Sequence, residues 1–249
     1  LKQKFNVLAT EGNKNNEYGL PLTLINLKPE HQVAIIEMGI NSPGEMEYLT
    51  NIAQPTIGLI TNIHAAHIGQ FKSLEHIAEE KFKIFLSDKL QIAILNNDDH
   101  RLTNLKSSLS GINTLLYSSS DKNLNNKTDN KTNNNIDVYA TDIQWGNSIA
   151  GILMQFNLHT PISDDILGIP LIGTHWISNA TAAATASLAV GANIENIKIG
   201  LQEIKPVKGR VYPYYLDNDR ILIDDSYNAS FESYIQAINT LHNLPEKRV

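Results

Sequence analysis

The stretch Thr56-Ile57-Gly58-Leu59-Ile60-Thr61-Asn62 decides the fold, because an apolar run passes directly into polar residues. The same design recurs in Val33–Ile36, which ends at Glu37. It recurs again in Ile92–Leu95, which ends at Asn96. Runs without polar alternation are typical of parallel strands buried on both faces. Because ligands of open α/β sheets bind at the carboxyl ends of strands, we expect a site at the edge that holds Glu37 and Asn62.

Helical segments alternate with these strands. Ser42 to Ile52 follows the first strand, and Ser73 to Leu86 follows the second, with Ser73 as the N-cap. This alternation predicts an α/β fold with a mostly parallel sheet flanked by helices. Further strands are expected at Lys4 to Ala9, Asp137–Ala140, Met154–Leu158 and Arg220–Ile223, and further helices at Asn179 to Val190 and Ser230 to about His242.

Composition narrows the possible functions. The 249 residues include 20 basic and 26 acidic side chains, a formal net charge of −6, which argues against a nucleic-acid partner. No Cys is present, so disulfides, thiolate metal sites and a Cys nucleophile are excluded. No apolar run is long enough to cross a membrane, and the first residues lack a signal peptide. We therefore expect no membrane insertion and a cytoplasmic location.

Two changes in composition indicate the domain organisation. The segment 118–135 has seven Asn among eighteen residues and one apolar side chain, which predicts a flexible surface insertion. A second change near Val211 to Asn218 predicts a boundary, with one domain over 1–212 and the beginning of another over 213–249. Both ends of the chain interrupt the expected strand and helix pattern, so we expect a piece of a longer protein.

Three residues are candidates for a metal site. Glu37 ends an apolar strand, and His67 follows the strand that ends near Asn62. Each alone is more often structural, but on neighbouring strand ends they would form a mixed oxygen and nitrogen site for Mg²⁺ or Mn²⁺. Lys81 lies on the apolar stripe of its helix. Its ammonium either reaches out to solvent or is held inside, where burial lowers its pKa.

Polar motifs follow at other element ends. Asn-rich residues 10–21 follow the first strand and are most often simply a turn. Residues 173–179 contain a Gly-x-His-x-x-x-Asn spacing before the Ala-rich helix, where Ser178 or Asn179 either caps the helix or meets an anionic ligand. Arg210 beside Gly209 and the carboxylates Asp224 and Asp225 extend this set. No Gly-Lys pair and no Gly-x-Gly occurs, which excludes a Walker A loop and a dinucleotide fingerprint.

Taken together, these motifs resemble the Mur ligase family over nearly the whole chain. The matching residues are Thr10-x-Gly12-Asn13-x-Asn15-Asn16-x-x-Gly19-x-Pro21, Glu37-Met38-Gly39 with Gly44-Glu45, Thr61-Asn62 with Ala66-His67, Gly173-x-His175, Gly209-Arg210, and Asp224-Asp225-Ser226-Tyr227-Asn228-Ala229. The resemblance implies the central ATP-binding domain of a three-domain ligase. The N-terminal domain, the phosphate loop and most of the Rossmann-like C-terminal domain would then lie outside this chain.

The resemblance also implies a reaction and a role for each motif. UDP-N-acetylmuramoyl-tripeptide and D-alanyl-D-alanine would be joined through an acyl phosphate formed from ATP. Mg²⁺ would be bound by Glu37, by His67 and by Lys81 as a carbamate. Lys81, His67 and Asn62 would be catalytic, Asn179, Arg210, Asp225 and His175 would contact ATP, and Thr10, Asn13, Asn15 and Asn16 would bind the muramoyl peptide.

Two positions depart from the family pattern, and two other functions stay open. Trp176 replaces the usual Asn, and Lys83 replaces an acidic residue two positions after Lys81. The chain could instead belong to an amide ligase of the same superfamily that acts on a different acid. A domain that binds a nucleotide without catalysis is the remaining alternative.

Overall fold

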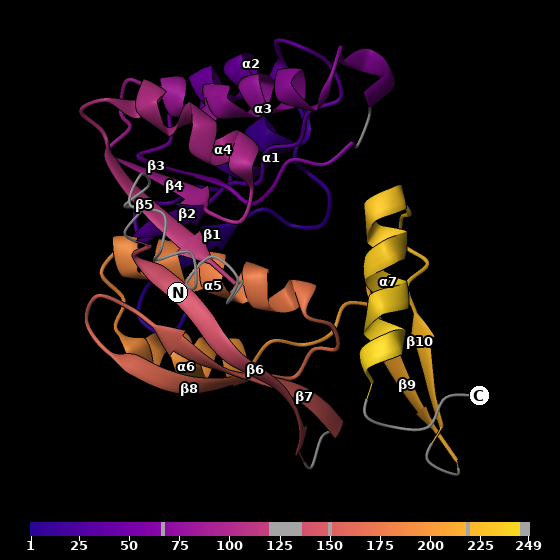
Figure 1. Cartoon of the computed structure of the whole chain (residues 1–249). Coiled ribbons are helices and arrows are strands. Elements are labelled where there is room, and N and C mark those ends of the chain that lie inside the picture. The colour runs from indigo at the N-terminus through magenta and orange to yellow at the C-terminus, as the bar shows by residue number, and fades with distance from the viewer. Residues whose placement is uncertain (66–67, 120–135, 149–150, 218–219, 245–249) are drawn as a thin grey trace, which may run out of the picture.

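A six-stranded mixed sheet forms the centre of the computed structural model, which describes residues 1–65, 68–119, 136–148, 151–217 and 220–244 (Figure 1). The strands follow one another in chain order: β3 (Ile57–Ile60), β4 (Ile92–Asn96), β5 (Asn113–Ser118), β6 (Val138–Ser148), β7 (Gly151–His159) and β8 (Asp164–Ile169). The pairs β3–β4, β4–β5 and β5–β6 are parallel. The pairs β6–β7 and β7–β8 are antiparallel. The predicted α/β fold with a mostly parallel sheet is confirmed.

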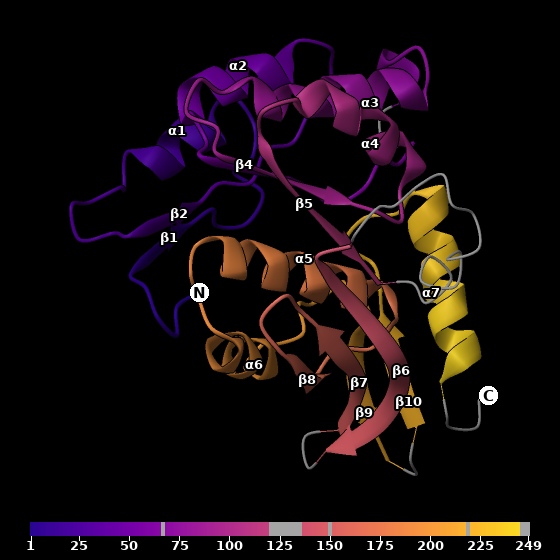
Figure 2. The same cartoon turned by 60° about the vertical axis from the view of Figure 1, so that its left-hand side comes forward.

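Helices cover both faces of this sheet, as Figures 1 and 2 show. Ile94 of β4 packs in the cluster that contains α5 residues, whereas its neighbours Ala93 and Leu95 pack in the opposite cluster, with α3 and α4. This explains why the strand is an unbroken apolar run. The helices are α2 (Glu45–Ala53), α3 (Leu74–Phe82), α4 (His100–Leu105), α5 (His175–Ala189) and α6 (Ile194–Gln202), with short 3-10 turns η1 (Ile68–Gln70), η2 (Lys83–Leu86) and η3 (Lys106–Leu109).

A second, two-stranded sheet holds the N-terminal residues. β1 (Val7–Ala9) pairs parallel with β2 (Val33–Ile35), and α1 (Gly19–Leu24) lies between them in the sequence. This corrects the expectation that β2 is a buried neighbour of β3: within the described residues β2 pairs only with β1, and Ile35 is 47% exposed. Glu37 and the end of β3 therefore belong to different sheets.

The C-terminal residues form a hairpin and a helix. β9 (Tyr212–Leu216) and β10 (Arg220–Asp224) pair antiparallel, and α7 (Phe231–Asn243) follows. Val211 packs with Ile152 and Ile172, which attaches the hairpin to the main body. The predicted boundary after residue 212 falls inside β9.

Several element ends differ from the sequence prediction. α2 begins at Glu45 because Gly44, with φ of 90°, adopts a left-handed cap. α5 begins at His175, one turn earlier than predicted, with Thr174 as its N-cap. The predicted insertion lies outside the described residues from 120 to 135. Among the described residues, no helix combines the length and apolar character needed to span a bilayer.

Candidate functional site

A cleft of about 840 Å³ lies between the carboxyl edge of the sheet, the start of α5 and the C-terminal hairpin and helix. Five sequence-predicted residues line it: Asn62, His175, Asn179, Arg210 and Asp225. Its size is within the range of small-molecule sites. The fold thus brings together polar residues from four separate stretches of the chain.

The first turn of α5 forms one wall of the cleft. Because the helix starts at His175, Asn179 is one turn further along the same face. Burial lowers the pKa of His175, and the nearby carboxylate of Asp225 opposes this shift only in part. The buried atoms His175 Nδ1 and Trp176 Nε1 have no hydrogen-bond partner among the described residues. Both residues line the cleft, and in the described part of the chain these two nitrogens are the buried polar atoms at its wall that lack a partner.

The opposite wall is held by hydrogen bonds on both sides of Arg210. The carbonyl of Gly209 accepts from the Tyr227 amide at 2.9 Å, and the Val211 amide donates to Asp225 Oδ1 at 3.1 Å. Gly209 and Val211 both have positive φ, 76° and 50°. The Arg210 guanidinium carbon lies 4.4 Å from the centroid of the Tyr227 ring. Residues 209–211 and residues 225–227 are therefore held against each other.

Lys81 of α3 contacts the backbone just after β3. Its Nζ donates to the backbone carbonyl of Asn62 at 3.2 Å, and Ile63 N donates to Asp99 Oδ2 at 2.8 Å. Burial lowers the pKa of Lys81, and the charge of Asp99 partly counteracts that effect. Lys81 is thus mostly buried, with its ammonium bonded to the backbone at the sheet edge. Asn62, whose carbonyl Lys81 contacts, is itself a lining residue of the cleft.

The predicted substrate residues gather elsewhere, at the β1–β2 edge. Thr10 Oγ1 accepts from the Glu37 amide at 3.0 Å, and Asn15 Nδ2 donates to Glu37 Oε1 at 2.8 Å. Asn16 Oδ1 accepts from backbone amides at the start of α1, and Asn13 is exposed. None of these residues lines the cleft: Asn62 does, whereas Glu37, which we expected at the same edge, follows β2 of the smaller sheet.

The three predicted metal ligands are only partly described. His67 lies outside the described residues. No group of three or more His, Asp or Glu side chains suited to a metal occurs in the described part of the chain. An unmodified Lys81 has only donors and cannot bind a cation. Burial lowers its pKa, and as a carbamate it would present oxygens, the ligand type that Mg²⁺ prefers.

Sequence reasoning missed a buried carboxylate, Glu80, next to Lys81. Lys83 Nζ lies 2.7 Å from Glu80 Oε1 and 3.8 Å from Glu47 Oε2. Burial alone would raise the pKa of Glu80, but hydrogen bonds from Lys83 and from the Gly44 amide outweigh it and lower the pKa. Lys83 therefore forms ion pairs with Glu80 and Glu47, whereas Lys81 contacts the backbone of Asn62. The i, i+3 spacing of Glu80 and Lys83 was the available signal.

Comparison with known proteins gives consistent matches. The family model of the Mur ligase middle domain matches residues 1–187. The UDP-N-acetylmuramoyl-tripeptide--D-alanyl-D-alanine ligases of Escherichia coli (strain K12) and of Buchnera aphidicola from Acyrthosiphon pisum are each 36% identical over 250 residues, which is 100% of this chain and 52% of each relative. The chain thus spans about half the length of the curated relatives it matches.

Solved structures agree with these matches. MurF from Acinetobacter baumannii has a TM-score of 0.85 and 31% identity, covering 98% of this chain and 50% of that one. MurF from Thermotoga maritima in complex with ADP has a TM-score of 0.79 and 25% identity, covering 99% of this chain and 53% of that one.

Proposed function

This chain belongs to the Mur ligase family, and from that premise we propose that its cleft binds ATP for a ligase that joins D-alanyl-D-alanine to UDP-N-acetylmuramoyl-tripeptide. One observation carries the proposal: Asn62, His175, Asn179, Arg210 and Asp225, which come from separate segments, line one cleft. The names of the relatives and the ADP complex of the Thermotoga maritima protein support it.

Each cleft residue has a chemistry suited to a part of ATP. The exposed guanidinium of Arg210 suits a phosphate group, because it offers several donors and a permanent charge. Asp225 uses Oδ1 for the Val211 amide and retains acceptor capacity for ribose hydroxyls. The Asn179 amide both donates and accepts, as adenine recognition requires. Burial lowers the pKa of His175 and so favours the neutral imidazole, in which one ring nitrogen can accept a hydrogen bond.

The proposed reaction has two displacements. A carboxylate oxygen of the tripeptide attacks the γ-phosphorus of ATP, and ADP leaves. The amine of D-alanyl-D-alanine then attacks the acyl carbon, phosphate leaves, and the amine loses a proton. In-line positioning of these groups and charge stabilisation are the main protein contributions to such phosphoryl transfer. Asn62 and His175 are the residues we assign to the region of the transferring phosphate.

Mg²⁺ is part of the proposal through Glu37, His67 and carbamylated Lys81. When bound, the metal would neutralise negative charge on the phosphates. Glu37 offers a carboxylate that Asn15 orients at 2.8 Å. Lys81 is supported as a carbamate by its burial and its lowered pKa.

The remaining assignments concern the substrate edge and the domains. We assign Thr10, Asn13, Asn15 and Asn16 to the muramoyl-peptide substrate. Asn13 is the exposed member, whereas Thr10 and Asn15 bond Glu37. We assign residues 1–212 to the central domain and 213–249 to the beginning of the next. The pairing of β9 with β10, apart from the six-stranded sheet, supports this division.

A second candidate function is nucleotide binding without turnover by these 249 residues alone. The observation in its favour is the absence of any Gly-Lys pair, which leaves the chain without a Walker-type phosphate loop and its lysine. This candidate is compatible with the first if a further segment supplies the loop.

A hybrid enzyme tests the proposed reaction. The 249 residues replace the matched half of the Escherichia coli relative, which is 36% identical. We expect ADP release that requires both UDP-N-acetylmuramoyl-tripeptide and D-alanyl-D-alanine. The same hybrid with Arg210→Ala is the control and should lose this release while keeping its thermal unfolding temperature. A folded hybrid that binds ADP but does not join the two substrates would contradict the proposed reaction.

A further inference from the structure

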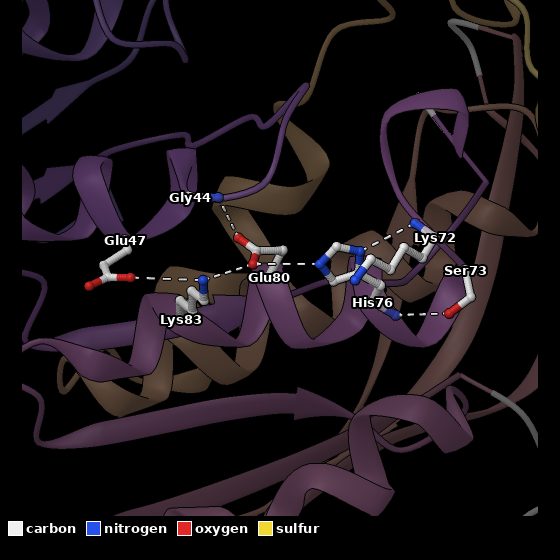
Figure 3. A network of polar contacts seen from close by, with 7 residues as sticks. All are labelled: Gly44, Glu47, Lys72, Ser73, His76, Glu80 and Lys83. Atoms are coloured by element: carbon white, nitrogen blue, oxygen red, sulfur yellow. Dashed lines mark hydrogen bonds and ion pairs between the residues drawn. The ribbon is translucent and has the colours of Figure 1, made fainter.

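The buried carboxylate of Glu80 is the centre of a polar network between α2 and α3 (Figure 3). Glu80 is only 5% exposed. Its Oε2 accepts from the Gly44 amide at 2.8 Å, and its Oε1 accepts from Lys83 Nζ at 2.7 Å. His76 Nε2 lies 3.9 Å from the same Oε1. Several donors therefore face one buried charge.

The network joins segments that are distant in sequence. Gly44 ends the loop that begins after Glu37, and it is 36 residues from Glu80. His76 Nδ1 accepts from the Lys72 amide at 3.2 Å, which places the His76 proton on Nε2, the nitrogen that faces Glu80. Glu80 is thus bound to the loop before α2 and is linked through His76 to the turn before α3.

The loop from residue 37 to residue 44 is fixed at both of its ends. At its start, Asn15 bonds the Glu37 carboxylate at 2.8 Å and accepts from the Gly39 amide, also at 2.8 Å. At its end, Glu80 bonds the Gly44 amide. Without Glu80, the Gly44 amide would lose its carboxylate acceptor, and a hydrogen bond to a charged group is stronger than one between neutral groups. The end of the loop nearest to α3 would then be released.

Glu80 also precedes Lys81 directly on α3. A carboxylate that is bonded to the Glu37 loop therefore lies on the backbone that carries Lys81. These two adjacent residues contact different segments: Lys81 donates to the carbonyl of Asn62, and Glu80 accepts from the amide of Gly44.

We propose that Glu80 is a positioning residue that sets the placement of the Glu37 loop relative to Lys81, and thereby the affinity of the chain for a divalent cation. This inference rests on the proposed function, in which Glu37 and Lys81 bind the metal. Groups that orient metal ligands typically change metal affinity by about 10- to 100-fold when they are removed.

The test measures Mn²⁺ binding to the 249-residue chain in bicarbonate buffer by electron paramagnetic resonance. Glu80→Ala should weaken Mn²⁺ binding by at least about tenfold. Glu80→Gln should have a smaller effect, because its carbonyl oxygen can still accept from the Gly44 amide. Glu79→Ala is the matched control: Glu79 is exposed, on the same helix, and carries the same charge. It should leave Mn²⁺ affinity unchanged.

Binding of AMP in the presence of a chelator separates positioning from general unfolding. The AMP affinity of Glu80→Ala should stay within about twofold of the wild-type value, since the nucleotide cleft does not include Glu80. A proportional loss of AMP and Mn²⁺ affinity would overturn the positioning role. Unchanged Mn²⁺ affinity in Glu80→Ala would overturn it as well.

Hydrogen exchange distinguishes a failure of this inference from a failure of the proposed metal site. If the wild-type chain binds no Mn²⁺, the metal part of the proposed function is wrong. Faster exchange across both residues 38–44 and the start of α3 in Glu80→Ala, but not in Glu79→Ala, would still support Glu80 as the link between them. Faster exchange limited to Gly44 would overturn it.

Discussion

The cleft and the β1–β2 edge both collect polar residues that follow strands, but they treat those residues differently. In the cleft, Asn179 and Arg210 are exposed, and the buried nitrogen Nδ1 of His175 has no partner among the described residues. At the edge, Asn15 bonds the side chain of Glu37 and Thr10 bonds its amide. One region retains unused hydrogen-bonding capacity around an open space, and the other uses that capacity internally.

This difference shows how similar motifs divide into two roles. Side chains that converge on a cleft without satisfying one another are available to a ligand. Side chains that bond one another across β1 and β2 stabilise the loop geometry. Substitutions in the cleft should therefore change nucleotide binding more than stability, and substitutions at the edge should change stability more than nucleotide binding.

The largest expected effect concerns catalysis by the cleft alone. The 249-residue chain, incubated with Mg-ATP, UDP-N-acetylmuramoyl-tripeptide and D-alanyl-D-alanine, should release no substrate-dependent phosphate. It has no Gly-Lys pair to align the phosphates, and alignment alone contributes about 7–11 kcal/mol to lowering such barriers. A colorimetric phosphate assay against a no-enzyme blank checks this. Release above the blank would show that the cleft suffices.

Arg210→Ala should weaken ADP binding by about 10- to 100-fold, because a charge-assisted hydrogen bond to phosphate contributes roughly 1.5–3 kcal/mol. Isothermal titration calorimetry measures this, with Arg220→Ala as the control, since Arg220 lies in β10 and does not line the cleft. Equal affinities for Arg210→Ala and Arg220→Ala would remove Arg210 from the nucleotide site.

Asn15→Ala tests the other region. It should lower the free energy of unfolding by about 0.5–1.5 kcal/mol, because Glu37 loses a hydrogen bond, and it should leave ADP affinity unchanged. Urea unfolding provides the measurement. Asn13→Ala is the control, because Asn13 is exposed and should tolerate the change. A loss of ADP affinity without a loss of stability would reverse the proposed division of roles.

The smallest expected effect is a pH dependence from His175, since one group titrates and Asp225 offsets part of the shift. The pKa of His175 is lowered in the folded state from its ordinary value of 6.5, so the unfolded chain binds more protons in this range. The associated stability is present above pH 6.5 and is lost as pH falls through the folded-state pKa. Unfolding of wild type and His175→Asn between pH 8 and pH 5 should diverge only on the acidic side. Parallel curves would contradict the shift.

The sequence was sufficient where the signal was local. The apolar runs at Ile57–Ile60 and Ile92–Leu95 predicted the edge strand β3 and its neighbour β4. β5 was missed because it opens with the polar pair Asn113-Thr114. β8 was missed because it opens with Asp164-Asp165. Both strands are stabilised by pairing with neighbouring strands, which their own residues do not predict.

The candidate site shows the same limit. Asn62, His175, Asn179, Arg210 and Asp225 were found because each belongs to a short motif. The bond between Glu80 and Gly44 joins residues 36 positions apart, and no local pattern encodes that contact. The position of Glu37, which follows β2 in the smaller sheet, was likewise unpredictable, since it depends on β2 pairing with β1.

The hydrogen bonds around Arg210 have a mechanical consequence. Gly209 is bonded to Tyr227 and Val211 to Asp225, so Arg210, Asp225 and Tyr227 are held together on one side of the cleft. His175 and Asn179 stay with α5, which is anchored in the main core. A nucleotide that contacts both walls would therefore link the C-terminal segment to α5 and reinforce the packing of Val211 against Ile152 and Ile172.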